Sequence, residues 1–214
     1  MRLSPGRFNR LLGSDQGGLG QAVTWRRASF CPCRAVYSGA AEPDCPLCQG
    51  RGTLWAVPVA AWTGLAGMKQ TREWAAFGEW QSGDVVLSIP SDSPLYAAGE
   101  NDRVLMTQSS EAFSTGLTRG VKDQPPFMVV EVTEVFWRDP ATKARVNGAL
   151  PSVAPDNTLT WASGGPPDGV QYSVSGRCRP EYYIFRDLVQ DRAHSGGLAL
   201  PRKTVARRFD LMGR

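Results

Sequence analysis

Four of the five cysteines in this chain form two close pairs. Cys31 and Cys33 form a C-x-C pair, Cys45 and Cys48 form a C-x-x-C pair, and eleven residues separate the two pairs. Two pairs of thiolates that are delivered from two turns are the usual ligand set of a tetrahedral structural zinc site. The spacing therefore predicts that the four cysteines together bind one structural Zn2+. Four reduced thiols and a redox pair are the alternatives.

A site with four cysteine ligands is expected to support structure rather than catalysis. Four thiolates close a tetrahedral shell, whereas catalytic zinc keeps one position open and needs a general base nearby. A redox centre would need a lowered thiol pKa within a thioredoxin-like βαβ pattern, which the sequence does not show. The chain has a single histidine, His194, and the sequence contains no G-x-S-x-G nucleophile elbow with which it could form a catalytic triad. We therefore predict that the chain is not an enzyme. The weaker alternative is a hydrolase with His194 in its active site.

Two glycines follow the second cysteine pair at a spacing that is typical of a zinc-binding turn. In the segment CPLCQGRG, residues 45–52, Pro46 fixes a turn, while Gly50 and Gly52 allow the backbone to curl so that amide hydrogens point at sulfur. This C-P-x-C-x-G-x-G spacing resembles one unit of the DnaJ-type zinc-binding repeat. The resemblance covers eight residues and implies a metal-binding knuckle. It does not imply chaperone function, because the further repeats and the J-domain are absent.

The elements around this knuckle are predicted to be short β-strands. The chain has 23 glycines and 16 prolines, which favour frequent turns, and 42% hydrophobic residues, which suit a folded core. In residues 170–179, apolar or small residues alternate strictly with polar ones, so that Tyr172, Val174 and Cys178 share one face of a strand. Cys178 is therefore predicted to be a buried thiol and not a fifth ligand. We expect a mainly β fold, with a single β-sandwich or barrel-like domain, a small N-terminal zinc-knuckle module and extended terminal arms.

The expected organisation has four parts. We predict an arm that orders only against a partner, a zinc-stabilised module, a connecting segment, and a β domain with a basic C-terminal tail, over residues 1–24, 25–56, 57–80 and 81–214 respectively. Residues 64–83 fit either a short helix or an aromatic strand. Residues 52–68 carry no charge but are too short and too interrupted for a membrane span, which favours a buried strand pair or core loop. The N-terminus has no secretory signal, so folding in a reducing cytoplasm is expected.

Positive charge gathers at the two ends of the chain. The net charge is +4, yet residues 1–34 carry six arginines against one aspartate, and residues 202–214 carry four arginines and a lysine against one aspartate. The middle of the chain is therefore acidic. Basic ends suit contact with phosphates or with acidic protein surfaces, although solvated termini are the simpler alternative. The candidate contact residues are Arg2, Arg7, Arg10, Arg202, Lys203, Arg207 and Arg208.

Two stretches carry a resemblance to a known class of proteins. Residues 90–103 read P-x-D-S-P-L-Y-x-x-G-x-N-D-R, and residues 167–174 read P-x-G-V-Q-Y-S-V. Together with the segments around them, they resemble small virion proteins of tailed bacteriophages, of the head-tail connector or head-closure type. The resemblance implies a ring at the neck of the virion, made in the bacterial host cytoplasm. The implied partners are copies of the chain itself, the portal or adaptor protein, tail proteins and, without sequence preference, packaged DNA; no membrane is implied.

The residues themselves suit a ring subunit, because basic ends and an acidic body offer different surfaces to neighbouring copies. The alternative is a sequence-tolerant nucleic-acid-binding protein of the zinc-ribbon kind. Arginines around the cysteines favour this alternative, whereas the modest net charge and the lack of a base-reading helix or stacking motif count against it. These arginines are Arg26, Arg27, Arg34 and Arg51.

Overall fold

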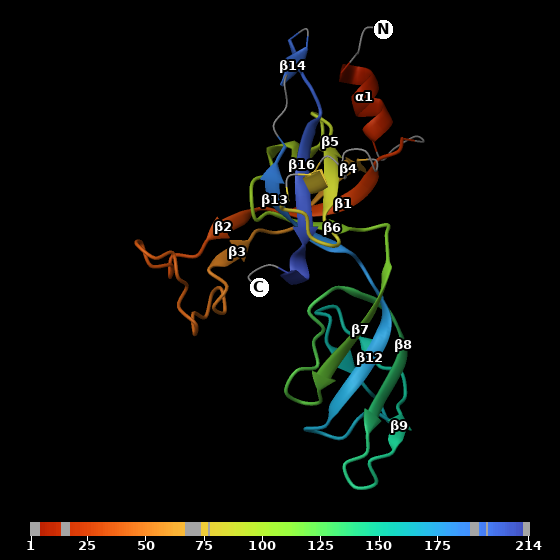
Figure 1. Ribbon diagram of the computed structural model, residues 1–214. Helices are drawn as coiled ribbons and strands as arrows, with labels where there is room; N and C mark the ends of the chain where they lie inside the picture. The colour runs from red at the N-terminus through yellow and green to blue at the C-terminus, as the bar shows by residue number, and fades with distance from the viewer. Residues whose placement is uncertain are drawn as a thin grey trace. The chain divides into compact units, whose positions relative to one another are not determined.

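The computed structural model describes residues 5–13, 18–66, 74–76, 78–188, 193–195 and 197–211. Within them, nearly all regular structure is β-strand, which confirms the expected mainly β class. The chain divides into two compact units (Figure 1). The first unit comprises Met1–Gln108 and Glu181–Arg214, and the second comprises Ser109–Pro180.

The first unit is built on a closed barrel of six antiparallel strands. Its order is β1-β4-β5-β16-β13-β6, and β1 pairs with both β4 and β6 to close it. Alternating residues such as Val23 and Trp25 in β1, and Val104 and Met106 in β6, are buried in its core. The strands are β1 (Gln21–Arg26), β4 (Val59–Leu65), β5 (Val85–Ile89), β6 (Arg103–Met106), β13 (Glu181–Asp187) and β16 (Arg202–Arg208).

The barrel boundaries differ from the single β domain expected over 81–214. Two of its strands, β1 and β4, come from the segments expected to be an arm, a zinc module and a connector. Residues 109–180 form the second unit, with a core of their own. The physical reason is that β5 and β6 would each leave an open edge, and pairing with β4 and β1 satisfies these backbone groups.

The N-terminal segment is more ordered than expected within the described residues. Helix α1 (Pro5–Leu12) lies against β4, where Leu12 packs on Gly64. The Asn9 side-chain amide also donates to Ser91 Oγ at 3.0 Å. Part of the predicted arm is therefore docked on its own barrel and needs no partner to order it.

The remaining elements of the first unit are short. A hairpin of β2 (Ala28–Phe30) and β3 (Thr53–Trp55) carries the cysteine loop. Residues 74–76 of the ambiguous segment are helical, while Met68 and Phe77 lie outside the described residues. Among the described residues, no helix has the length and apolar character needed to cross a membrane. The other elements are η1 (Pro94–Ala97), β14 (His194–Ser195), β15 (Leu198–Ala199) and η2 (Phe209–Leu211).

The second unit is a four-stranded antiparallel sheet of order β7-β12-β8-β9 with a small added hairpin. The alternation predicted for 170–179 is confirmed, since Tyr172, Val174, Gly176 and Cys178 are buried along β12. A bulge interrupts the pairing of β12 with β8 at Ser175/Gly176. The strands are β7 (Glu111–Thr118), β8 (Val129–Arg138), β9 (Arg145–Asn147), β10 (Ser152–Val153), β11 (Leu159–Thr160) and β12 (Gln171–Cys178).

Candidate metal centre

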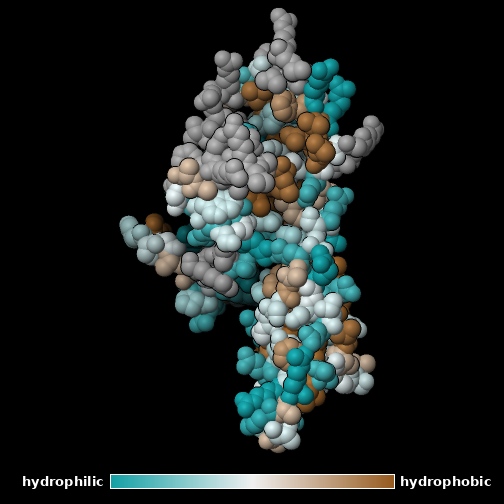
Figure 2. Space-filling view, turned by 45° about the vertical axis from the view of Figure 1, so that its right-hand side comes forward, coloured by the Kyte–Doolittle hydropathy of each residue, from teal (hydrophilic) through white to brown (hydrophobic). Residues whose placement is uncertain are grey.

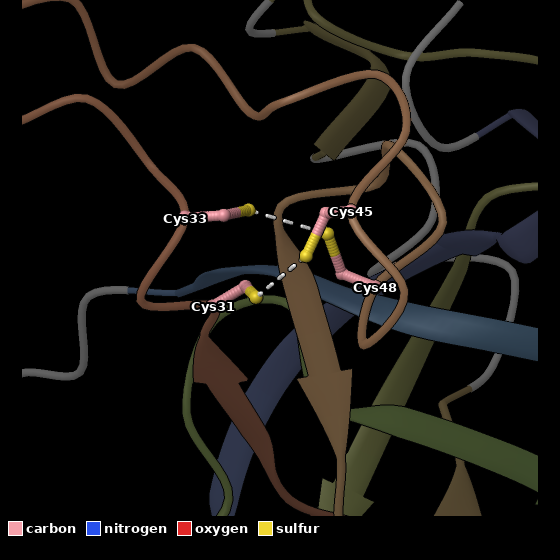
Figure 3. A group of neighbouring side chains, drawn as sticks. All are labelled: Cys31, Cys33, Cys45 and Cys48. Atoms are coloured by element: carbon pink, nitrogen blue, oxygen red, sulfur yellow. Dashed lines mark hydrogen bonds between the residues drawn. The ribbon is translucent and has the colours of Figure 1, made fainter.

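The structure brings the four predicted ligands together. The sulfur atoms of Cys31, Cys33, Cys45 and Cys48 all lie within 4.8 Å of one another. The Cys31 and Cys45 sulfurs are 3.7 Å apart, and those of Cys33 and Cys48 are 3.5 Å apart (Figure 3). Four sulfurs bound at about 2.3 Å around a tetrahedral zinc ion lie about 3.8 Å from one another. The sulfur positions therefore fit a tetrahedral metal site and are compatible with zinc.

The β2–β3 hairpin explains why the two pairs meet. The hairpin pairs Phe30 with Thr53, and the Cys31 amide then donates to the Gly52 carbonyl at 2.9 Å. The two ends of the cysteine loop are thereby fixed beside each other. Each pair lies within a turn, because the Arg34 amide donates to Cys31 O at 3.1 Å and the Gln49 amide to Cys45 O at 2.8 Å. Each turn directs its two thiols toward the same point.

The glycines of the second pair act as the sequence predicted. Gly50 and Gly52 have φ values of 78° and 68°, a region in which residues with a side chain are strained. A Cβ at Gly50 would also lie 2.9 Å from the Pro43 carbonyl oxygen. The resulting curl lets the Gly52 amide donate to Cys48 Sγ at 3.2 Å. Such amide-to-sulfur bonds stabilise a thiolate and so favour metal binding.

The thiols of the cluster differ in acidity. Hydrogen bonds from the backbone amides of Cys48 and Leu47 lower the pKa of Cys45 to about 7. A backbone hydrogen bond from Glu42 favours the Cys33 thiolate, but burial and the three neighbouring sulfurs raise its pKa to about 12. The neighbouring sulfurs disfavour one another's ionisation. A cation at the centre would lower the pKa values of the thiols, because it stabilises all the thiolates at once.

A buried carboxylate joins the cysteine hairpin to the barrel. Asp102, which is 2% exposed, accepts a hydrogen bond from the Ala28 amide of β2 at 2.6 Å. It also accepts from Trp25 Nε1 at 2.7 Å and from the Gly99 amide at 2.9 Å. One side chain therefore holds the start of the hairpin against β1 and the turn that precedes β6.

The second strand of the hairpin is anchored by an aromatic residue. Trp55 Nε1 donates to the Asn101 carbonyl at 3.1 Å, and the Trp55 ring meets Phe209 edge-on at 5.4 Å. The Arg103 guanidinium stacks on both rings and pairs with Glu181 at 2.6 Å. Sequence reasoning did not assign these anchoring roles. The sequence marks Asn101, Asp102 and Arg103 only as part of a resemblance, because their contacts come from distant strands.

The basic candidates fall into three groups. Arg7 and Arg10 are exposed on α1, and Lys203 is half-buried, whereas Arg2 lies outside the described residues. Arg202 pairs with Asp187 and donates to two backbone carbonyls, and Arg208 pairs with Asp210. The third group is a single buried residue, described next.

Arg207 is an internal residue and not a surface contact. It is 7% exposed, and its guanidinium makes two 3.0 Å bonds to the buried carboxylate of Asp84. It also donates to the Glu79 carbonyl at 2.7 Å. The hydrogen bond to Asp84 and its negative charge raise the pKa of Arg207, although burial acts in the opposite direction. Because both side chains of the pair are buried within the first unit, Arg207 does not belong among the residues predicted to contact DNA or partners.

The other residues considered for chemistry are not assembled into a site. His194 and Ser195 are both exposed on the two-residue strand β14. Cys178 is buried in the second unit, where its thiol faces Glu111 at 3.9 Å, as expected for a structural cysteine. Among the described residues, the four cysteines are the one group of His, Cys, Asp or Glu side chains placed to hold a metal ion.

The chain was also compared with known proteins. It matches no protein-family model, and no curated protein is significantly similar to it.

Proposed function

We propose that the chain is a structural subunit of a tailed-bacteriophage virion that forms a ring at the head-tail interface and carries a structural Zn2+. In this proposal it joins the portal or adaptor to the tail and has no catalytic activity. The metal holds the cysteine loop in one conformation, so that the loop presents a fixed surface to a neighbour.

The observation that carries the structural role is the four-sulfur cluster on an anchored hairpin. Cys31, Cys45 and Cys48 are buried, and all four thiols belong to one loop of about 20 residues, too few to bury a core of its own. A metal would supply the stability that the loop lacks. Four sulfur ligands leave no open position for a substrate.

The virion part of the proposal is based on the resemblance of residues 90–103 and 167–174 to head-tail connector and head-closure proteins, and residues 90–103 have a structural role in this chain. Ser93 caps η1, Leu95 is fully buried, and Asp102 binds both the barrel and the hairpin. Residues 90–103 therefore connect the barrel to the cysteine hairpin within the first unit.

The first test combines metal analysis with assembly. The purified chain is expected to contain one zinc per chain and to bind the portal or adaptor protein encoded by the same genome, which pull-down and negative-stain microscopy would measure. Mass spectrometry of purified virions should find the chain in particles. Arg7→Ala with Arg10→Ala probes the exposed helix, and Arg177→Ala is a surface control outside the predicted contacts. A chain that is absent from virions and binds neither protein would contradict the proposal.

A second candidate function has one specific observation in its favour. The cysteine loop exposes Tyr37 fully and Phe30 by 69%, and Arg34 stacks on the Phe30 ring at 4.2 Å. Exposed rings can stack on bases, and exposed arginines of this region, such as Arg27 and Arg51, can contact phosphates. A nucleic-acid-binding protein would bind single-stranded DNA with steep salt dependence, and Tyr37→Ala would weaken that binding. Weak binding that Tyr37→Ala leaves unchanged would favour the neck protein.

A further inference from the structure

The second unit has a sheet edge that lacks a partner strand. Strand β7 is the outermost strand of its sheet and pairs with β12 along Glu111–Thr118 (Figure 1). No other strand among the described residues pairs with its second side. An open edge presents backbone N–H and C=O groups that can template pairing with another extended chain.

The ladder pattern shows which groups face outward. The Arg119 amide donates to the Val170 carbonyl, so this pair is hydrogen-bonded. Hydrogen-bonded and non-hydrogen-bonded pairs alternate along an antiparallel ladder. The backbone groups of the odd-numbered residues of β7 therefore point to β12. Those of Ala112, Ser114 and Gly116 point away from the sheet.

The open segment has defined limits. At one end, Lys122 bridges Thr118 on the free side, and the Lys122 amide donates to the Thr118 carbonyl. What remains open is 112–116, whose centre is Ser114. The exposed side chains along it are small and uncharged, without the lysine or proline that usually protects an edge. The opposite edge strand, β9, is protected, since it has three residues and carries the exposed Arg145.

We propose that two copies of this chain associate through β7, paired antiparallel about a two-fold axis at Ser114. In this register Ala112 faces Gly116 of the second copy, and Ser114 faces its own counterpart. All three residues with outward groups then exchange N–H···O=C bonds with a counterpart. The edge is its own complement, which is the requirement for an isologous contact.

The side chains are compatible with this register. On the exposed face, Ala112 and Ser114 have small side chains and Gly116 has none, which leaves room for close approach of the two strands. Arg119, just beyond the end of β7, already pairs with Asp123 at 3.1 Å, so the proposed contact depends on backbone pairing and not on a charge pair. Figure 2 shows hydrophobic residues of the second unit interspersed with hydrophilic ones on the visible face.

This contact goes beyond the proposed function and is separate from it. An isologous contact is complete after two copies, whereas a ring needs heterologous contacts. A result for the dimer therefore leaves the test of portal and virion binding unaffected, and failure of either proposal can be recognised independently.

A charge exchange at the two-fold axis tests the proposal. Sedimentation velocity on the full chain is expected to show a concentration-dependent dimer. Ser114→Lys and Ser114→Asp each place like charges opposite each other and should raise the dissociation constant about fivefold. An equimolar mixture of the two variants should form mixed dimers again, because the charges are then opposite. Ser114→Thr is the matched control and should dimerise as the unmodified chain does.

A proline variant tests the backbone pairing separately. The Ala112 amide points outward, so Ala112→Pro removes an outward donor and no bond to β12. It should weaken the dimer, while Ala112→Thr should not, and tryptophan fluorescence would verify that the unit stays folded. A chain that remains monomeric up to its solubility limit would overturn the proposal. So would a dimer that neither lysine nor proline weakens, or charge variants that do not recover on mixing.

Discussion

At the scale of single residues, much of the basic C-terminal strand is engaged within the protein. Arg202 and Arg208 form ion pairs along the strand, and Arg207 is buried against Asp84. The Trp74 indole and the Gln81 amide also donate to the Asp84 carboxylate. A cluster of basic residues in a sequence therefore does not by itself give a phosphate-binding surface.

The buried pair gives a clear stability prediction. Arg207→Ala removes the cation that compensates Asp84 and leaves a buried charge, so the free energy of unfolding should fall by about 3 to 5 kcal/mol. Urea denaturation would measure it. Arg10→Ala, at an exposed helix position, is the control and should change stability by less than about 0.5 kcal/mol. Equal effects of the two substitutions would show that the pair is not buried in solution.

The cysteines give a second prediction at this scale. Cys48→Ser is expected to abolish stoichiometric zinc binding and to make the loop between Phe30 and Thr53 sensitive to proteases, while the barrel remains folded, because the metal supports only the local loop. Elemental analysis, limited proteolysis and circular dichroism would measure the three parts. Cys178→Ser should keep the metal. Loss of the whole fold on mutating Cys48 would mean that the cluster is an integral part of the barrel core.

Metal affinity should depend on pH in a defined direction. Binding needs thiolates, so acid releases the metal. The pKa of Cys45 in the metal-free cluster is lowered to about 7, whereas that of Cys33 is raised to about 12. Above pH 7, Cys45 has already lost its proton, and below pH 7 binding must displace one more. The apparent zinc affinity should therefore fall with decreasing pH, and below pH 7 it should fall by about one further factor of ten per pH unit, as chelator competition would show. A constant slope through pH 7 would contradict the assignment.

At the scale of elements, a close backbone approach fixes one glycine in the second unit. At Gly176, in the bulge of β12, an added Cβ would lie 2.0 Å from the Glu131 carbonyl oxygen. Gly176→Ala should therefore destabilise the unit by about 1 to 3 kcal/mol through overpacking. Gly116→Ala is the matched control in the same sheet, since its Cβ would have contacts of 3.5 Å or more. Thermal melts of the two variants that coincide would show that the strands shift to accept the methyl group.

At the scale of the whole molecule, the second unit is an insertion between two paired strands. Strand β6 precedes it and β13 follows it, and Leu105 pairs directly with Glu181 in the barrel. Replacing 109–180 by a short glycine-containing turn should therefore leave an antiparallel hairpin and an intact barrel. The shortened chain is expected to fold cooperatively and to bind one zinc, as a thermal melt and metal analysis would show. An unfolded product would mean that the barrel depends on the inserted unit.

The sequence alone determined the features that depend on nearby residues. Two cysteine pairs, a proline and two glycines within 31–52 specified the four-cysteine cluster, because turn geometry and sulfur spacing are fixed over a few residues. The period-two alternation at 170–179 likewise predicted both the strand and the burial of Cys178. In both cases, residues within a short segment were sufficient to predict the local structure.

Only the tertiary structure decided which distant segments pair. The closure of the barrel by β1 and β4, the insertion of the second unit and the burial of Arg207 against Asp84 all join residues far apart in the chain. Strands are recognisable from local alternation, but their partners depend on which edges the rest of the fold leaves open. In the same way, Asp102 and Trp55 became anchors of the cysteine hairpin only when folding brought β1, β3 and the turn before β6 together.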